Sequence, residues 1–419
     1  MKTYDYPNSR ALFDRAAQVI PSGIYGHLGP AEGCFIPVSA YPFYAQRAQG
    51  AYVWDVDGNR FIDYMCAYGP IVLGYNHPAV DRAAREQLEK VNCGVLPGEI
   101  MVKLAEKLVS MIHSADWAFF AKNGGDVTNL AMLAARAHTR RKKIIKFAGG
   151  YHGVAQWMQF VGNAGIIDED VSNIITLPFN DAEAVSAAFK RYPGQIAGII
   201  ATPYHHPAMA DNALPLPGFW TEVRKLCTQE GAVLIVDDVR AGFRLDLHGS
   251  DHHYGFEADL ICYCKALGNG YNISALCGKN TLKEAVSSVF YTGSYWLSAM
   301  PMAAALATLE ELEKVDGAKL MTSLGKQLTQ GLEEAAQEYG FHLLVTGEPA
   351  MWNMRLTDDD SGVLHQQWVS ECVRRGVFFT SHHNLFINTA LTQEDIKYTL
   401  DVARDAFCAL KATRERSKA

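Results

Sequence analysis

A lysine and an aspartate, each placed directly after a run of apolar residues, are the residues of this chain best suited by type and spacing to catalysis. The run 232–236 ends in Asp237, and a second run, 259–264, ends in Lys265. Buried parallel strands read as continuous apolar runs, and ligands of parallel sheets lie beyond the carboxyl ends of the strands. An acid and a lysine at neighbouring strand ends indicate an electron-sink cofactor. The lysine would be its Schiff-base partner, and the acid would be the partner of a ring nitrogen.

Two glycine-rich turns add to this pair. The apolar strand from Trp117 passes through Gly124 and Gly125 into a helix that runs to about residue 139. Backbone N–H groups at a helix N-terminus bind anions, although such turns are common and an ordinary turn fits the local pattern too. After a strand at 143–147, Tyr151 lies between glycines that would let its ring approach a flat ligand. An ordinary loop tyrosine fits that segment equally well.

The elements that must position these residues predict an α/β protein. Strands alternate with helices across residues 117–265, which is typical of a parallel sheet with helices on both faces. After a long helix at 299–315, short strands alternate with helices. We therefore expect a large cofactor-binding domain at residues 61–315. A smaller α+β domain would be formed by residues 316–419 together with the N-terminal segment 1–60.

Composition excludes several classes of function. The 419-residue chain has a net charge of -7, and its longest basic block is Arg140–Lys143, which argues against nucleic acid and anionic membrane surfaces. No stretch approaches the roughly 18 uninterrupted apolar residues of a membrane span, and we expect a cytoplasmic protein. The nine cysteines never form Cys-x-x-Cys, and the three histidine pairs lack acidic or cysteine partners at ligand spacing. Neither a disulfide framework nor a metal site is expected.

The glycine-rich helix start, the Gly-Tyr-His-Gly loop, the acid and the lysine, in this order, resemble the fold-type I pyridoxal-phosphate enzymes. In detail the chain resembles the class III aminotransferases, closest to the glutamate-1-semialdehyde 2,1-aminomutase branch. The resemblance covers nearly the whole chain and is most specific in residues 146–153, 234–244 and 265–270. It implies pyridoxal 5'-phosphate as cofactor and a large domain with a mostly parallel seven-stranded sheet. It also implies a homodimer with shared active sites.

The resemblance also implies roles for individual residues. Lys265 would carry the cofactor as a Schiff base, Asp237 would keep the pyridine nitrogen protonated, and Tyr151 would stack on the ring; these three are the expected catalytic residues. Val239 would pack on the opposite face of the ring. Ser294 falls where the family has a threonine that reaches the partner subunit's phosphate. The implied cofactor-binding residues are Asn123, Gly124, Gly125, Tyr151, His152, Asp237, Val239, Lys265 and Ser294.

Departures from the family pattern bear on the substrate. The phosphate turn reads Asn123-Gly-Gly-Asp126 in place of Ser-Gly-Thr-Glu, and the arginine that binds the aminomutase substrate should fall near Gly29, which carries no charge. An uncompensated carboxylate in a closed cleft is costly, which disfavours the aminomutase reaction itself. Strand alternation would point one possible replacement, Arg240, away from the cleft, and a structural salt bridge is its alternative. The possible replacements are His27, Arg240, Arg244 and Arg355.

We therefore expect a pyridoxal-phosphate-dependent aminotransferase that moves an amino group from an amine or amino acid to a keto acid or aldehyde. An aminomutase, a racemase or epimerase, or a lyase of an amino compound would use the same cofactor, and a cofactor-free binding protein is a further alternative. The expected substrate pocket has aromatic walls and few fixed charges, although a core position suits each of its residues equally. These residues are Tyr25, His27, Tyr68, Tyr204, Trp296 and His382.

Overall fold

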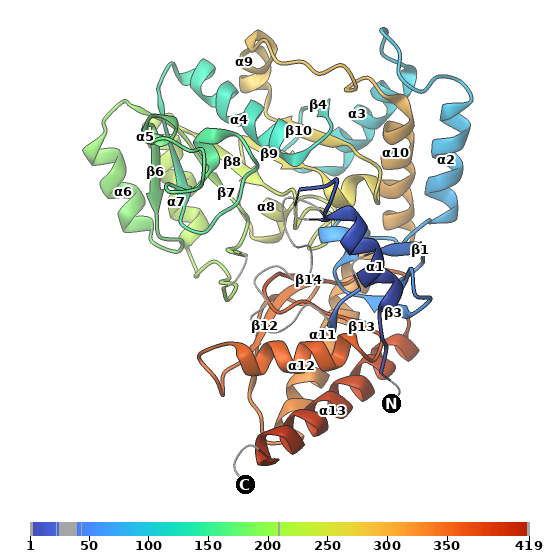
Figure 1. The fold of residues 1–419 in the computed structure, drawn as a ribbon. Helices are drawn as coiled ribbons and strands as arrows, with labels where there is room; N and C mark the ends of the chain where they lie inside the picture. Colours follow the sequence, from blue (N-terminus) through green and yellow to red (C-terminus); the bar gives the residue numbers. More distant parts are fainter. Residues whose placement is uncertain (1–2, 22, 25–39, 43, 208–209, 417–419) are drawn as a thin grey trace. The chain divides into compact units, whose positions relative to one another are not determined.

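The computed structural model describes residues 3–21, 23–24, 40–42, 44–207 and 210–416. The chain forms two compact units (Figure 1). Unit 1 comprises Met1–His77, Ala208–Asn212 and Leu320–Ala419, and unit 2 comprises Pro78–Pro207 and Ala213–Lys319. The sequence analysis places the domain boundaries at residues 60 and 315. The compact units instead divide the chain near residues 77 and 319, because residues 61–77 pack with unit 1.

Unit 2 is built around a seven-stranded sheet in the order β4-β10-β9-β8-β7-β5-β6 (Figure 1). Strand β10 runs antiparallel to both of its neighbours, whereas the neighbours from β9 to β6 pair in parallel. The expected mostly parallel seven-stranded sheet is therefore confirmed. The strands are β4 (Trp117–Ala121), β5 (Lys143–Phe147), β6 (Ile174–Leu177), β7 (Ile196–Ala201), β8 (Val233–Asp237), β9 (Leu260–Tyr263) and β10 (Ser274–Gly278).

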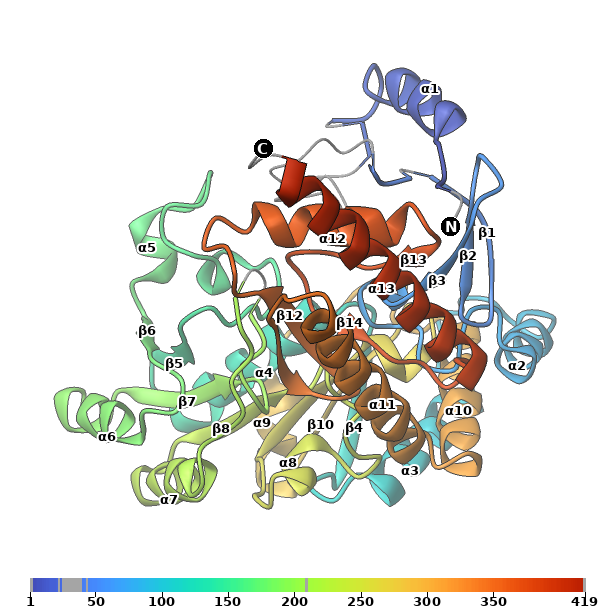
Figure 2. The same cartoon turned by 90° about the horizontal axis from the view of Figure 1, so that it is seen from below.

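Helices cover this sheet. The buried side of α4 (Gly124–Thr139), including Val127, Leu130 and Ala134, packs on residues of β5, β7, β8, β9 and β10 to form the main core cluster. Helices α2, α3 and α10 lie together near the β4 edge, and α6 and α7 lie near the β6 edge (Figures 1 and 2). The other helices of unit 2 are α2 (Pro78–Leu88), α3 (Glu99–Met111), α5 (Asp168–Val171), α6 (Ala182–Arg191), α7 (Phe219–Glu230), α8 (Ser250–His253), α9 (Lys283–Ser288) and α10 (Ala299–Lys314).

Unit 1 is an α+β arrangement with two small sheets. One has the order β1-β2-β3-β13 and contains the antiparallel hairpin of β2 and β3; the other has the order β11-β12-β14. Its strands are β1 (Ala45–Gln49), β2 (Tyr52–Asp55), β3 (Arg60–Asp63), β11 (Leu343–Glu348), β12 (Met351–Leu356), β13 (Val377–Phe378) and β14 (Leu385–Phe386). Its helices are α1 (Pro7–Ala16), most of α11 (Gly317–Glu338), α12 (Val363–Val373) and α13 (Gln393–Arg416).

Among the described residues, no helix is both long and apolar enough to span a bilayer.

Candidate functional site

Asp237 is the last residue of β8 and lies beside β9, the strand that leads to Lys265. Its side chain is buried, and its Oδ2 atom lies 2.6 Å from Nδ1 of His152. The backbone N–H of Val239 donates to the other carboxylate oxygen, Oδ1, at 3.1 Å. One contact on each oxygen fixes the orientation of the carboxylate. Since each oxygen carries two lone pairs, the group can still accept a further proton donor.

Lys265 begins the short 3₁₀ helix η5 (Lys265–Gly268) directly after β9. Its φ of 45° is in the left-handed region, where a non-glycine residue is strained, and such strain is concentrated at functional sites. Burial, and secondarily the positive charge of Arg240, lower the pKa of Lys265 to about 7. Desolvation disfavours the ammonium form. The Lys265 side chain can therefore act as a neutral amine near neutral pH, as a nucleophile or a proton carrier must.

The N-terminus of α4 forms one wall beside this pair. A Cβ atom on Gly124 would lie only 2.7 Å from Cγ1 of Val239, and a Cβ on Gly153 would lie 2.7 Å from Cα of Gly125. The α4 terminus therefore touches both Val239, two residues after Asp237, and the loop around residue 152. Glycine at position 124 is required by this close approach. Helical N–H groups in this first turn have no intrahelical partner and suit an anion.

Side-chain hydrogen bonds hold the loop that contains Tyr151, and one of them comes from α4. The Thr128 hydroxyl donates to the backbone carbonyl of His152 at 2.6 Å, and Gln159 donates to the carbonyl of Gly153 at 3.1 Å. Tyr151 itself is 55% exposed, so one large part of its ring is open to solvent or to a ligand. The structure thus brings the expected Tyr151 loop, phosphate turn, Asp237, Val239 and Lys265 segments together within unit 2.

The turn before α4 is held by Asp126. Its Oδ2 atom accepts from the backbone N–H groups of Lys122 at 3.1 Å and Asn123 at 2.8 Å. Asp126 therefore occupies the glutamate position of the family pattern. Its side chain caps backbone N–H groups that precede it in the sequence.

Ser294 and Trp296 lie in the segment of unit 2 between α9 and α10. Ser294 is exposed, and Trp296 packs edge-on against Phe119 of β4, with ring centroids 5.8 Å apart. The structure thus gives Trp296 a packing role on the sheet. Tyr204 is completely buried and packs against His206, with ring centroids 5.0 Å apart, which favours the core position for this tyrosine.

Two of the expected substrate residues belong to unit 1. Tyr68 ends the turn η3 (Cys66–Tyr68), in which three consecutive non-glycine residues have positive φ, and its ring lies edge-on to His383 at 5.3 Å. His382 lines a cavity of about 430 Å³ within unit 1 together with Arg355. Tyr25 and His27 lie outside the described residues.

Arg355 is occupied by a structural ion pair. Its Nε and Nη2 atoms donate to the two carboxylate oxygens of Asp211 at 2.8 and 2.9 Å. A guanidinium engaged in this bidentate way has little to offer a substrate carboxylate. Arg244 is completely buried. Of the possible replacements for the missing substrate arginine, Arg240 is the described residue that lies beside Lys265.

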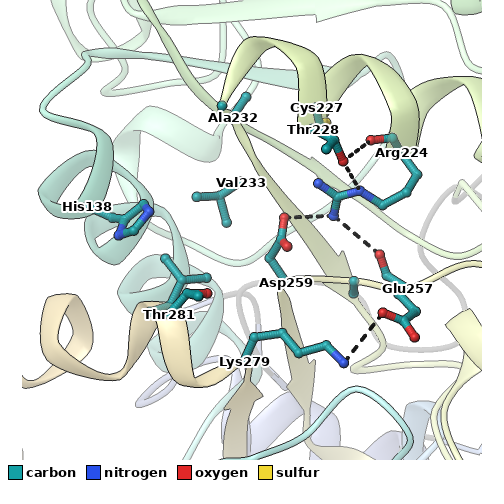
Figure 3. A pocket seen from close by; sticks show the side chains of 13 residues that line it. His138, Arg224, Cys227, Thr228, Ala232, Val233, Glu257, Asp259, Lys279 and Thr281 are labelled. Atoms are coloured by element: carbon teal, nitrogen blue, oxygen red, sulfur yellow. Dashed lines mark hydrogen bonds and ion pairs between the residues drawn. The ribbon is translucent and has the colours of Figure 1, made fainter.

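A second cavity of about 580 Å³ lies at the opposite end of β8, where Val233 begins the strand (Figure 3). Its charged groups neutralise one another. Arg224 contacts Asp259 at 2.7 Å and Lys279 contacts Glu257 at 3.6 Å. No group of three or more His, Cys, Asp or Glu residues in the described part of the chain is arranged to hold a metal ion. The carboxyl end of β8, and not this cavity, therefore carries the reactive groups.

Comparison with known proteins identifies the family. Residues 36–404 match the model of the family described as aminotransferase class-III. The chain belongs to the class III aminotransferases. It is 42% identical over 399 residues to an aminopentol aminotransferase of Sphingopyxis macrogoltabida, covering 95% of this chain and 93% of that protein. This aminotransferase therefore depends on pyridoxal phosphate, as its family does.

Solved structures agree with this assignment. The FumI protein of Sphingopyxis sp. MTA144, solved with pyridoxal phosphate as the internal aldimine, superimposes with a TM-score of 0.93 at 41% identity, covering 96% of each chain. A glutamate-1-semialdehyde aminomutase of Pseudomonas aeruginosa PAO1 superimposes with a TM-score of 0.85 at 20% identity, covering 97% of this chain and 95% of that one. The aminomutase likeness concerns the fold. The named relative at higher identity is an aminotransferase.

The residues of unit 2 fit this cofactor. A Cβ atom at Gly124 would fill the space beside Val239, as expected where a flat ligand and a phosphate must come close to backbone. The buried Asp237 carboxylate suits a cationic ring nitrogen, and the partly buried Lys265 amine suits covalent attachment. The contact between His152 and Asp237 was not predicted from sequence, because the two residues are 85 positions apart and only the glycines around Tyr151 marked that loop.

Proposed function

We propose that this aminotransferase moves an amino group from an amine or amino acid donor to a keto acid or aldehyde acceptor, with Lys265 as the covalent attachment point of its cofactor. The observation that carries the proposal is the juxtaposition of Lys265 and the buried Asp237 carboxylate at the ends of the adjacent strands β8 and β9. Bound pyridoxal phosphate supplies an electron-withdrawing ring at this place. The neutral Lys265 amine then takes a proton from the substrate carbon that bears the nitrogen.

The other residues bind and orient. In this proposal the N–H groups of Gly124 and Gly125, at the positive end of α4, hold the phosphate, and Asn123 adds a polar side chain. Asp237 keeps the ring nitrogen protonated, because an ionised carboxylate in a partly dry site strongly favours a cation. The proposed packing residues are Tyr151 and Val239, one on each face of the ring, and His152 orients the carboxylate through its 2.6 Å contact.

We also propose a homodimer, in which Ser294 of each chain reaches the cofactor phosphate of the partner. Ser294 is exposed beside a group of exposed apolar side chains: Phe290 is 94% and Tyr295 72% exposed. A bridge between Cys93 and Ser298 brings the equally exposed Val95 segment next to them. Exposed apolar patches of this kind mark protein interfaces. Light scattering coupled to size exclusion should give twice the chain mass of 46.2 kDa.

The compartment is a further part of the proposal. All the described cysteines are free, including the exposed Cys93 and Cys408. Free thiols are typical of a reducing compartment, and we propose the cytoplasm.

A screen of amines and amino acids tests the function. A donor added alone should convert the cofactor to its pyridoxamine form, which should persist until a keto acid or aldehyde is added. An aminomutase, racemase or lyase would instead return the cofactor to its starting form without an acceptor. Absorbance in the near-ultraviolet and visible range distinguishes the two, and a cofactor that returns unaided with every active donor would refute the proposal.

A further inference from the structure

Arg240 lies in the turn that follows β8, three residues after Asp237. Strand alternation would have directed its side chain away from Asp237 and Val239. The strand, however, ends at Asp237, and residues 239–244 form turns, so the alternation does not reach Arg240. Arg240 is half-buried as a residue, and its positive charge is, after burial, the largest cause of the lowered pKa of Lys265.

The partners of Arg240 leave its charge unbalanced. Its Nη1 atom donates to the backbone carbonyl of His206 at 3.0 Å and lies 3.3 Å from Nδ1 of the same residue. Among the described residues, no carboxylate forms an ion pair with it, in contrast to Arg355 with Asp211 and Arg224 with Asp259. A guanidinium has five N–H donors, so most of the hydrogen-bonding capacity of Arg240 is still available.

The charges around Arg240 do not supply the missing partner. The carboxylate of Asp237 is already in contact with His152 at 2.6 Å and Val239 at 3.1 Å. The buried Nε2 atom of His206 also has no hydrogen-bond partner in the described part of the chain. A buried polar atom without a partner is costly, and natural proteins normally satisfy it with solvent or a ligand.

We propose that Arg240, together with His206, binds the carboxylate of the keto acid acceptor in the aminotransferase reaction. The inference rests on the proposed function and specifies its acceptor. The planar guanidinium matches a carboxylate in two parallel hydrogen bonds, which a lysine cannot reproduce. The Nε2 atom of His206 provides a further polar contact beside it. An amine donor without a carboxylate does not need Arg240, so the residue separates the two halves of the reaction.

The experiment compares Arg240→Gln and Arg240→Lys with the wild-type holoenzyme. Pyruvate and the uncharged propanal serve as acceptors for enzyme already carrying the amino group, and propionate serves as an unreactive carboxylate. For Arg240→Gln we expect kcat/KM for pyruvate to fall about 100-fold, mainly through KM, because a charge-assisted pair is lost. The propanal and donor half-reactions should stay within about threefold, and Arg240→Lys should recover part of the pyruvate activity.

Three further measurements make the outcome decisive. The dissociation constant of propionate, measured by calorimetry, should rise about 100-fold in Arg240→Gln, whether or not the preparation turns over. Arg224→Gln is the matched control, because Arg224 is paired with Asp259 at the other end of β8 and should leave all acceptors unaffected. The band positions in the absorption spectrum of the resting holoenzyme should not change in Arg240→Gln, since the guanidinium is assigned to substrate and not to cofactor; only the pH at which the bands interconvert should rise, because Arg240 lowers the pKa of Lys265.

Specific results would overturn the inference. Equal losses with pyruvate and propanal would mean that Arg240 merely supports the loop at His206. Shifted band positions in the resting spectrum would assign the guanidinium to the cofactor, and unchanged propionate binding would remove the carboxylate site. In each case the wild type would still transfer amino groups. Failure of the proposed function itself would show separately, as a wild-type enzyme whose cofactor no donor converts.

Discussion

Substitution of Gly124 tests the proposed phosphate-binding turn at the N-terminus of α4, because Gly125 beside it provides a matched control. A methyl group at Gly124 would lie 2.7 Å from Cγ1 and 3.0 Å from Cγ2 of Val239. Carbon atoms prefer separations of about 3.5–4.0 Å, so Val239 or the turn must move by several tenths of an ångström. A methyl group at Gly125 would meet Cα of Gly153 at 3.5 Å, which is ordinary contact. The two substitutions add the same group, one residue apart.

The magnitude follows from these distances. Overpacking of a well-packed site costs about 1–3 kcal/mol, and replacing glycine by alanine in a helix returns at most about 1 kcal/mol. The displaced Val239 is the proposed packing residue for one face of the ring. We therefore expect Gly124→Ala to weaken pyridoxal-phosphate binding about 10- to 30-fold, at about 1.4 kcal/mol per tenfold. Gly125→Ala should stay within about threefold of wild type.

The assay is titration of apoenzyme with pyridoxal phosphate, followed by protein fluorescence and by absorbance. Thermal unfolding with and without the cofactor gives a second measure, because a ligand stabilises the folded state according to its affinity. Without cofactor the two variants should melt closer together than they do with it. The reasoning fails if Gly124→Ala binds as tightly as wild type, or if Gly125→Ala loses as much affinity as Gly124→Ala.

Three further predictions concern Lys265 and Asp237. Lys265→Ala should abolish turnover while circular dichroism and the oligomeric mass stay unchanged, and retained turnover would contradict its assignment. Asp237→Asn should slow the donor half-reaction about 100- to 1,000-fold in single-turnover measurements, because a neutral amide cannot hold the ring proton; a loss below about tenfold would argue against this role. Since the pKa of Lys265 is lowered to about 7, its reactive neutral form is present above that pH and lost below it. Apoenzyme should therefore recombine with cofactor at a rate that rises through about pH 7 and then levels off, with a more alkaline midpoint in Arg240→Gln; a pH-independent rate would refute the shift.

The parallel strands and their ends could be predicted from sequence, because fully buried strands are continuous apolar runs. The strand before Asp237 and the strand before Lys265 are such runs, and the structure pairs them as neighbours. The expected bounds of β5 agree with those observed. Apolar runs of this kind depend on local composition, so the buried strands that they form can be recognised in a single sequence.

What could not be predicted depends on contacts between distant segments. Strand β10 has a mixed sequence of small residues, and nothing local indicates that it inserts antiparallel between β9 and β4. The contact of His152 with Asp237 joins residues 85 positions apart. Arg355 gave no sequence sign of its ion pair with Asp211, since that pairing spans 144 positions. Tyr204, one of the expected pocket residues, is completely buried, and the polar composition of its loop gives no sign of this burial.

The end of β8 at Asp237 explains why residues 237–240 do not all follow the alternation of a strand. In a continuing strand, residues 238 and 240 would share one face and residues 237 and 239 the other. Asp238 does point into the interior, where it accepts hydrogen bonds from the backbone N–H and hydroxyl of Ser250, and burial raises its pKa to about 7. Because the strand ends at Asp237, the side chain of Arg240 does not have to point to the same face as that of Asp238.

Arg240 instead lies near Lys265. In the proposed site, the end of β8 and the turn after it would provide the carboxylate for the cofactor ring through Asp237, the packing group through Val239, and a cation for an incoming anion through Arg240. The same cation lowers the pKa of the Lys265 amine, second only to burial. A bound carboxylate would offset that effect and favour protonation of the lysine, since an opposite charge stabilises the charged form. Binding of the keto acid would then promote the proton transfer that its own half-reaction requires, a coupling that an uncharged aldehyde cannot provide.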